Sequence, residues 1–468
     1  MRTIWLGFLA FQMTSVLAVS ASPSSPSGSP APLAQLQDRL HTFEQRRSYE
    51  GPPLTLNAAL EEALEKNPTL LALRRQFEAA RHRPAQERFL MPPSFDAQIW
   101  QWPINTLNPL NTNMYMFTFG QDIPGFGKRG LRASVVEKDV ALAQNQIAVR
   151  ARDVVDQVKR TYAELYLSRT AIDIHLASVD LLRQFADISE AKYVTGRISQ
   201  QDVLKAVVEI SKLHDDLVVL DERAQLAEAQ LNTLLDRPPG GPIGPLGEPR
   251  ERVLVPAAEE LQRLALENQP ELQTARLEIE RAEATLAVVE REYKPDFFVK
   301  GGYFLMPRQA DSWTLMAGLT WPTAPWSRGR LDAQKAEATA EIEAARAGQR
   351  AVENALRLTV QEAYVRVKAA EQRAALLRTS IVPQSNQTLE VSRIAYQTDR
   401  VDFLALIDNQ RVLLDAQLSY YNALSDLEQA RADLERAVGT DIDALGATPA
   451  AAADGSTDDP IVMKGVAR

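Results

Sequence analysis

The sequence of 468 residues contains no cysteine. A chain without cysteine has no thiol nucleophile, no disulfide framework and no thiolate metal ligands, and it cannot be acylated at an N-terminal cysteine. We therefore expect packing within the chain and association between chains to provide its stability.

Motifs for catalysis and for metal binding are also missing. The four histidines are scattered, with no pair at metal-ligand spacing: His41, His82, His175 and His214. The group His214-Asp215-Asp216 lies on a helical repeat, and we interpret it as a solvated helix face. The sequence contains no glycine-rich phosphate loop and no Gly-x-Ser-x-Gly elbow. We therefore expect no enzymatic activity, no cofactor and no bound metal.

Blocks of charge of one sign are absent as well. The chain has 52 Lys and Arg residues and 61 Asp and Glu residues, which gives a formal charge of −9 at pH 7. Basic residues alternate with acidic ones along the predicted helix faces, unlike the basic patches of nucleic-acid-binding proteins. Nucleic acid is therefore not an expected partner.

The apolar run near the N-terminus is short. It extends from Ile4 to Val19, less than the roughly 20 residues that a membrane-spanning helix needs. It follows Arg2 and ends at the small residues Val19-Ser20-Ala21, which is typical of a secretory signal peptide. We predict a signal peptide at residues 1–21, with a membrane anchor as the alternative, and a partly disordered leader at residues 22–53.

The rest of the chain repeats itself. The turn Tyr193-Val194-Thr195-Gly196-Arg197-Ile198 recurs as Tyr396-Gln397-Thr398-Asp399-Arg400-Val401, followed in both places by a matching helical seam. Ala-Leu-Glu-Lys-Asn-Pro at residues 63–68 likewise recurs as Ala-Leu-Glu-Asn-Gln-Pro at residues 265–270. This pattern indicates an internal duplication with a helix-turn-helix in each copy, whereas two unrelated hairpins are the alternative.

The duplication predicts the division of the chain. The first repeat covers residues 54–236, and Thr55 is expected to cap its first helix. A linker rich in proline and glycine follows at residues 237–255, and the second repeat covers residues 256–439. Residues 440–468 are predicted to form a disordered tail.

Each repeat contains a very long helix. No proline interrupts residues 128–194, and a helix of this length measures on the order of 100 Å at 1.5 Å per residue. The matching segment, residues 328–396, contains Pro383, which we expect to kink or divide the helix. Seams spaced by three and four residues predict packing against other helices, and a coiled-coil rod is the alternative arrangement.

Aromatic residues make up only 7% of the chain, and many of them lie in two short segments of each repeat. These segments are residues 93–102, 114–121, 295–305 and 312–321, each about as long as a tilted transmembrane strand. Their aromatic ends suit the two membrane interfaces, whereas a soluble hairpin packed on the helices is the alternative. An open four-stranded sheet cannot cross a bilayer with unpaired edges, so several chains must close it together.

This organisation resembles the TolC-like outer membrane efflux proteins, or outer membrane factors, of Gram-negative bacteria. The resemblance covers about residues 54–439 and includes the segments before Pro68 and Pro270, the two turns, and the junction Gln121-Asp122-Ile123-Pro124-Gly125-Phe126-Gly127-Lys128. It implies a mainly helical fold with a small transmembrane β part. Three protomers would form a helical barrel from long hairpins and contribute four strands each to a 12-stranded β-barrel.

The resemblance also implies the function. Such proteins lie in the outer membrane, in contact with its lipid, and extend into the periplasm as passive ducts for small molecules or metal ions. A periplasmic adaptor and an inner-membrane pump drive the export. The segment Phe126-Gly127-Lys128 is similar to members that serve heavy-metal pumps of the resistance-nodulation-division type. An exported coiled-coil scaffold is the alternative function.

Candidate site residues follow from the same resemblance. The two turns would dock the adaptor through Thr195, Gly196, Arg197, Thr398, Asp399 and Arg400. The alternative is simple turn chemistry, because glycine and aspartate tolerate left-handed backbone. Asp408 matches an acidic position that narrows the channel, and a ring of three such residues would favour cations. Ala405 stands where another acidic residue can occur, and a solvated helix aspartate is the alternative for Asp408.

Overall fold

The computed structural model describes residues 51–442, apart from residues 101, 103, 106, 107, 109, 110 and 249–255. The predicted signal peptide, nearly all of the leader and nearly all of the tail therefore lie outside the described residues. The chain divides into two units at residue 48, and the description below concerns the second unit alone. Within the described residues, no helix combines the length and the apolar character needed to cross a membrane.

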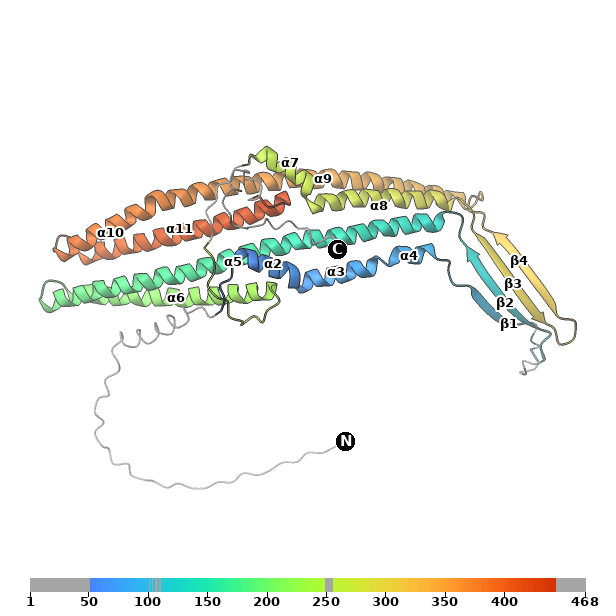
Figure 1. Ribbon diagram of the computed structural model, residues 1–468, viewed down its shortest axis with the longest axis horizontal. Helices are drawn as coiled ribbons and strands as arrows, with labels where there is room; N and C mark the ends of the chain where they lie inside the picture. The colour runs from blue at the N-terminus through green and yellow to red at the C-terminus, as the bar shows by residue number, and fades with distance from the viewer. Residues whose placement is uncertain are drawn as a thin grey trace, which may run out of the picture. The chain divides into compact units, whose positions relative to one another are not determined.

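The two repeats follow the same plan of short helices, two strands, a long helix and a returning helix (Figure 1). The first repeat consists of α2 (Leu56–Lys66), α3 (Pro68–Ala80), α4 (Arg83–Arg88), β1 (Ser94–Trp100), β2 (Met114–Ile123), α5 (Lys128–Val194) and α6 (Gln200–Leu234). The second consists of α7 (Ala258–Asn268), α8 (Pro270–Glu292), β3 (Phe297–Leu305), β4 (Ser312–Leu319), α9 (Arg328–Leu376), the π-helical segment η2 (Leu377–Ile381), α10 (Val382–Gln397) and α11 (Phe403–Val438). The predicted tandem duplication is confirmed.

The residue before Pro68 and the residue before Pro270 each tie their repeat to its own last helix. Asn67 ends α2, and its side-chain oxygen accepts hydrogen bonds from the first amides of α3. Its side-chain nitrogen donates to the carbonyl of Leu234 at the end of α6, at 3.1 Å. In the second repeat Gln269 donates in the same way to the carbonyl of Arg436 near the end of α11, at 2.9 Å. The duplicated amide thus ties each pair of short helices to the returning helix of its own repeat.

The long helices follow the proline pattern of the sequence. Helix α5 runs without a break for 67 residues, as predicted. In the second repeat Pro383 is the second residue of α10, and the five-residue π-helical segment η2 precedes it. Proline has no amide hydrogen and collides with the carbonyl four residues earlier, so a wider turn accommodates it. The predicted division of this helix is confirmed.

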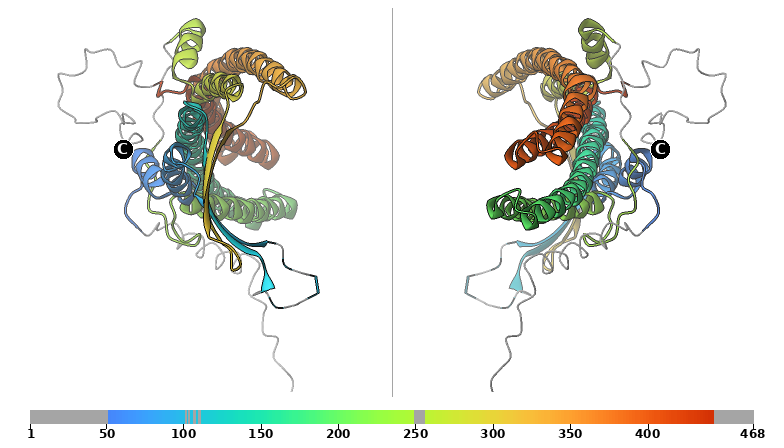
Figure 2. Two further views of the ribbon diagram at one scale, coloured as in Figure 1. Left: turned by 90° about the vertical axis from the view of Figure 1, so that its right-hand side faces the viewer. Right: turned by 90° about the vertical axis from the view of Figure 1, so that its left-hand side faces the viewer.

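The long helices of the two repeats form one curved layer, and the short helices α2, α3 and α7 pack on it (Figure 2). Helix α6 packs on α5, α5 packs on α11, and α11 packs on α9, so the hairpins lie side by side (Figure 2). Small and medium apolar side chains fill the contacts, as at Val360, Ala363 and Leu434. Thr55 caps α2 by accepting a hydrogen bond from the amide of Ala58, as predicted.

The four strands form one antiparallel sheet in the order β1-β2-β3-β4. Strand β2 of the first repeat pairs with β3 of the second along its length, from Tyr115 opposite Leu305 to Ile123 opposite Phe297. The sheet therefore joins the two repeats, and β1 and β4 form its two edges.

Candidate functional site

The register of the sheet separates apolar from polar side chains. Residues directly opposite one another in an antiparallel sheet point to the same face. One face, here called the apolar face, carries Gln121, Gly301 and otherwise Phe95, Ala97, Ile99, Tyr115, Phe117, Phe119, Ile123, Phe297, Val299, Tyr303, Leu305, Trp313, Leu315, Ala317 and Leu319. The other, here called the polar face, carries Ser94, Asp96, Gln98, Trp100, Met114, Met116, Thr118, Gly120, Asp122, Phe298, Lys300, Gly302, Phe304, Ser312, Thr314, Met316 and Gly318.

The apolar face is not covered by any other part of the described chain. Trp313 and Leu315 are 82% and 81% exposed, and every residue of β1 is exposed. Within the described chain, the strands make extensive contacts only with one another. Exposed apolar patches of this kind mark interaction with a membrane or a partner. The alternative of a soluble hairpin packed on the helices is therefore wrong.

Aromatic pairs lie at both ends of the apolar face. The rings of Tyr303 and Trp313 are 4.9 Å apart at one end. At the other end, where the helices begin, Phe126 pairs with Phe297 and Trp321 pairs with Trp326, at 6.3 and 6.1 Å. Along β4 and its extension, Trp313 and Trp321 are about 27 Å apart at 3.4 Å per residue. Because such strands tilt by about 35–45°, this length corresponds to a height of about 19–22 Å, somewhat less than the apolar band of about 25 Å that aromatic girdles flank in outer-membrane proteins.

A buried lysine lies at the junction between the sheet and the helices. Lys128, the first residue of α5, is 1% exposed, and its Nζ lies 2.9 Å from both Glu292 and Asp296. Asp296 also accepts a hydrogen bond from the amide of Gly125 at 2.7 Å. Burial alone would raise the pKa of both carboxyl groups, but these hydrogen bonds outweigh it and hold each pKa below its ordinary value. These ion pairs therefore connect the start of α5 in the first repeat to the second repeat.

The two predicted docking turns lie at the far end of the hairpins from the sheet (Figure 1), and all six of their candidate residues are exposed. Gly196 and Asp399 adopt left-handed backbone, with φ of 71° and 58°, as the turn chemistry predicts. Lys192 connects the turns, because its Nζ lies 2.5 Å from the Asp399 carboxylate and also donates to the carbonyl of Tyr396. The hydrogen bond from Lys192 to the Asp399 carboxylate lowers the pKa of Asp399.

The buried aromatic side chain of Tyr396 supports the contact between Lys192 and Asp399. The Lys192 Nζ lies 4.2 Å from the centre of the Tyr396 ring, and the Tyr396 hydroxyl is hydrogen-bonded to Ser189 at 2.9 Å. Tyr396 is 2% exposed and packs against Phe403. Sequence reasoning missed Lys192 and Tyr396 as members of this site, although Tyr396 begins the second repeated turn. Only the fold shows that Lys192 reaches the other turn.

Asp408 lies on α11, apart from the six turn residues. Its side chain is 57% exposed and lies 3.5 Å from Arg411. Arg411 binds Glu209 of α6 more closely, at 2.5 Å. Burial raises the pKa of Glu209, but the hydrogen bonds from Arg411 and Lys212 lower it more, so the net shift is downward. Asp408 therefore shares its nearest cation with a second carboxylate, which the sequence did not predict.

The histidine prediction needs a correction. His214 is 7% exposed, and its Nδ1 bonds to the carbonyl of Ile210 at 2.6 Å. Its neighbours Leu213 and Leu217 are also buried, so this part of α6 faces another helix and the interpretation of His214 as solvated is wrong. Asp215 and Asp216 are exposed, as predicted. In the described part of the chain, no group of three or more His, Asp or Glu residues could hold a metal ion.

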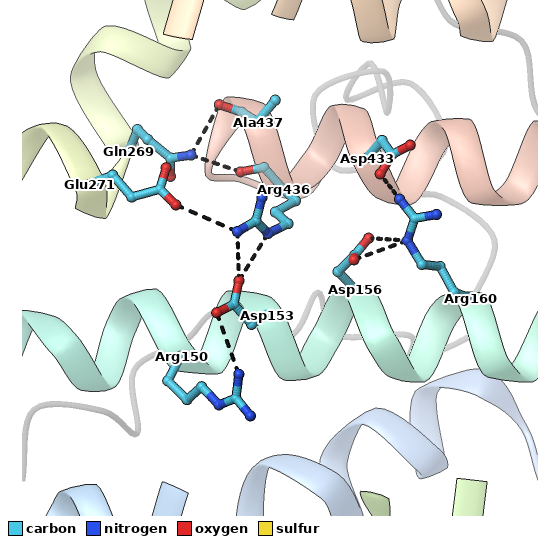
Figure 3. A network of polar contacts seen from close by, with 9 residues as sticks. All are labelled: Arg150, Asp153, Asp156, Arg160, Gln269, Glu271, Asp433, Arg436 and Ala437. Carbon is cyan, nitrogen blue, oxygen red and sulfur yellow. Dashed lines mark hydrogen bonds and ion pairs between the residues drawn. The ribbon is translucent and has the colours of Figure 1, made fainter. Parts of the chain in front are cut away.

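A polar network joins the repeats midway along α5 (Figure 3). Arg436 of α11 donates to Asp153 of α5 at 2.7 Å and lies 3.6 Å from Glu271 of α8. One turn away along α11, Asp433 pairs with Arg160 of α5. These pairs connect the first repeat to both ends of the second, and they are partly exposed, so their strength depends on salt.

These features define a class of proteins in which a small membrane sheet continues into long helical hairpins. The model of the outer membrane efflux protein family matches residues 59–237 and 261–440, and the chain belongs to this family. The cobalt-zinc-cadmium resistance protein CzcC of Cupriavidus metallidurans is 23% identical over 389 residues, which cover 83% of this chain and 90% of that protein.

Solved structures show the same fold. The open state of the MtrE outer membrane channel of Neisseria gonorrhoeae gives a TM-score of 0.69 at 16% identity, over 83% of this chain and 89% of that chain. The outer membrane protein VceC of Vibrio cholerae gives 0.68 at 18% identity, over 83% and 96%. The mainly helical fold that the resemblance implies is thus confirmed.

Family membership establishes the general function. The chain is an outer-membrane efflux channel, a passive conduit that is not an enzyme and that works as a trimer with a periplasmic adaptor and an inner-membrane pump. The predicted location in the outer membrane, with the helices extending into the periplasm, is confirmed. The alternative of an exported coiled-coil scaffold is excluded.

Proposed function

We propose that this channel exports divalent metal cations that a pump of the resistance-nodulation-division type supplies. The relative CzcC, which the chain matches over 90% of its length, is a cobalt-zinc-cadmium resistance protein. The junction Phe126-Gly127-Lys128 adds support, because it resembles members that serve such pumps. A passive conduit needs no resident metal site, so metal cargo agrees with the absence of a metal-binding group from the described residues.

The division of the sheet into an apolar face and a polar face is the observation that best supports a conduit. In the trimer, lipid covers the apolar face, and the edges at β1 and β4 pair with neighbouring protomers, because unpaired edges are not tolerated in hydrocarbon. The polar face, with Asp96, Asp122 and Lys300, then lines the water-filled path.

The two turns and Asp408 divide the work at the opposite end. The exposed turn residues Thr195, Gly196, Arg197, Thr398, Asp399 and Arg400 dock the adaptor. The shared contact of Lys192 with Asp399 presents both turns to the adaptor as one surface. Three copies of Asp408 form an acidic constriction near this end and attract cations, moderated by the neighbouring Arg411.

Metal retention tests this function. Cells that lack the channel but retain its pump and adaptor should accumulate more zinc, cobalt and cadmium than complemented cells, measured by elemental analysis after a metal pulse. Organic dyes and detergents serve as the comparison, because a general drug duct would change their accumulation by the same factor. Unchanged metal content together with increased dye retention would contradict metal cargo.

A further inference from the structure

The connection between β4 and α9 holds two exposed tryptophans beside the end of the apolar face. Trp321 is 63% exposed and Trp326 is 83% exposed, and their rings meet edge to face. The connection is ordered, since the Ser327 hydroxyl donates to the carbonyl of Pro322 at 2.8 Å and Ala324 is buried beneath it. Two indoles are therefore held in place with their rings open to the surroundings.

Two exposed arginines follow these tryptophans directly. Arg328 is 67% exposed, and its nearest carboxylate, Asp332, lies 3.6 Å away and also accepts a 2.7 Å hydrogen bond from Tyr293. Arg330 is exposed and makes no ion pair with any described residue. Arg330 is thus available for an external anion, and Arg328 is held only by one long, exposed ion pair with Asp332.

At the equivalent connection of the first repeat, between β2 and α5, internal contacts hold the basic side chains. Lys128 is buried between Glu292 and Asp296, and Arg129 donates to the backbone carbonyl of Arg88 at 2.9 Å. The cations of the first junction therefore serve the fold. The cations of the second junction have no comparable internal role, although they occupy the same boundary between sheet and helices.

We propose that the β4–α9 connection binds the headgroup of an anionic phospholipid in the inner leaflet of the outer membrane. Trp321 and Trp326 lie at the headgroup level, where indole rings are favoured, and Arg328 and Arg330, which point to different sides of the first turn of α9, each contact a lipid phosphate. Guanidinium groups suit this ligand because they bind phosphate oxygens through paired N–H donors. The inference rests on the outer-membrane channel function, because that function places this end of the sheet at the periplasmic membrane surface.

Quenching of Trp326 by a labelled lipid tests the inference. Trp5, Trp100, Trp102, Trp313 and Trp321 are replaced by phenylalanine, so that Trp326 is the one tryptophan left, and the purified trimer is placed in phosphatidylcholine bilayers. Trp326 fluorescence is then titrated with brominated phosphatidylglycerol or brominated phosphatidylcholine. We expect preferential quenching by phosphatidylglycerol, and roughly a fivefold loss of relative affinity for each arginine removed in Arg328→Gln and Arg330→Gln.

Matched variants separate a binding site from general surface charge. The double variant Arg357→Gln/Arg366→Gln removes two exposed arginines from the same helix and should keep the preference. The double variant Arg328→Lys/Arg330→Lys keeps the charge but loses the paired donors, so it should lose part of the preference, whereas a fully kept preference would contradict binding through the guanidinium donors. Equal quenching by both lipids in the parent protein, or an unchanged preference in Arg328→Gln/Arg330→Gln, would overturn the inference. A trimer that inserts but shows no preference leaves the channel function intact, whereas failure to insert would contradict both.

Discussion

Lys128 shows how much one buried charge can decide at the residue scale. It is 1% exposed and holds Glu292 and Asp296, which come from the second repeat. Lys128→Met leaves two partly buried carboxylates beside an uncharged, buried side chain. Glu292 and Asp296 are 28% and 37% exposed, so the loss should be that of hydrogen bonds to charged groups, about 1.5–3 kcal/mol, and the variant trimer should unfold at a lower denaturant concentration.

Arg132 provides the matched control for Lys128. It contacts the same Glu292 at 2.7 Å, but it is 42% exposed, so Arg132→Gln should cost about 1 kcal/mol or less. Because the pKa of Glu292 and Asp296 is lowered in the folded protein, their contribution is present at neutral pH and is lost as the pH falls through the lowered values. The difference between wild type and Lys128→Met should therefore narrow below about pH 4. Equal losses in both variants would refute a special role for burial.

In the proposed constriction, cation preference depends on Asp408. Asp408→Ala removes three charges from the proposed constriction, so single-channel conductance in planar bilayers should rise and block by multivalent cations should weaken. Asp426→Ala is the control, because Asp426 lies on the same helix, is 58% exposed and also pairs with an arginine. Identical channel recordings for wild type and Asp408→Ala would remove Asp408 from the constriction.

At the scale of elements, the two turns are the test of adaptor docking. Gly196→Pro conflicts with a φ of 71° and removes an amide that donates to Tyr193, so the first turn should lose its shape. Arg400→Glu reverses an exposed charge and leaves the backbone unchanged. Both variants should form trimers in the outer membrane and should lose efflux.

The control for the turns lies on α9. Arg366→Glu reverses a charge that is 65% exposed and far from either turn, so efflux should be preserved. Export is measured as metal retained by cells, and trimers are measured by electrophoresis without heating. Intact export in both turn variants would exclude the turns as adaptor contacts.

The elements themselves were predictable where local rules decide them. An unbroken helical pattern gave the bounds of α5, and Pro383 marked the division between α9 and α10. The contacts of the sites were not predictable, since Lys128 meets Glu292 across 164 residues and Lys192 meets Asp399 across 207. Such partners depend on how the repeats pack, and no local spacing in the sequence records that packing.

The two faces of the sheet were not predictable from the sequence either. Alternation along each strand is weak, because Phe298, Phe304 and Trp100 interrupt the polar positions. The register places Phe119 opposite Phe95 and Gly301, and only this alignment across four strands separates the two faces. The sequence predicted strands of transmembrane length, whereas the direction of their side chains required the paired structure.

At the scale of the whole chain, the duplication keeps the order of the main elements but not their chemistry. Asn67 and Gln269 make equivalent bonds to the two returning helices. By contrast, the first junction buries its cation and the second exposes two, and only the second long helix contains a π-helical segment. One repeat therefore anchors the fold at the membrane boundary, while the other presents groups to the surroundings.

The same scale offers a direct test of which sheet face meets lipid. Ala317 and Met316 are adjacent exposed residues of β4, on the apolar and the polar face, about halfway between Trp313 and Trp321. Arginine near the middle of a lipid-facing strand costs about 2–4 kcal/mol, so Ala317→Arg should sharply reduce trimers in the outer membrane. Met316→Arg places the same charge in the water-filled path and should leave trimer yield near wild type. Yield is measured by unheated electrophoresis of membrane fractions. Equal yields for the two variants would show that these faces do not divide lipid from water, and a loss confined to Met316→Arg would reverse their assignment.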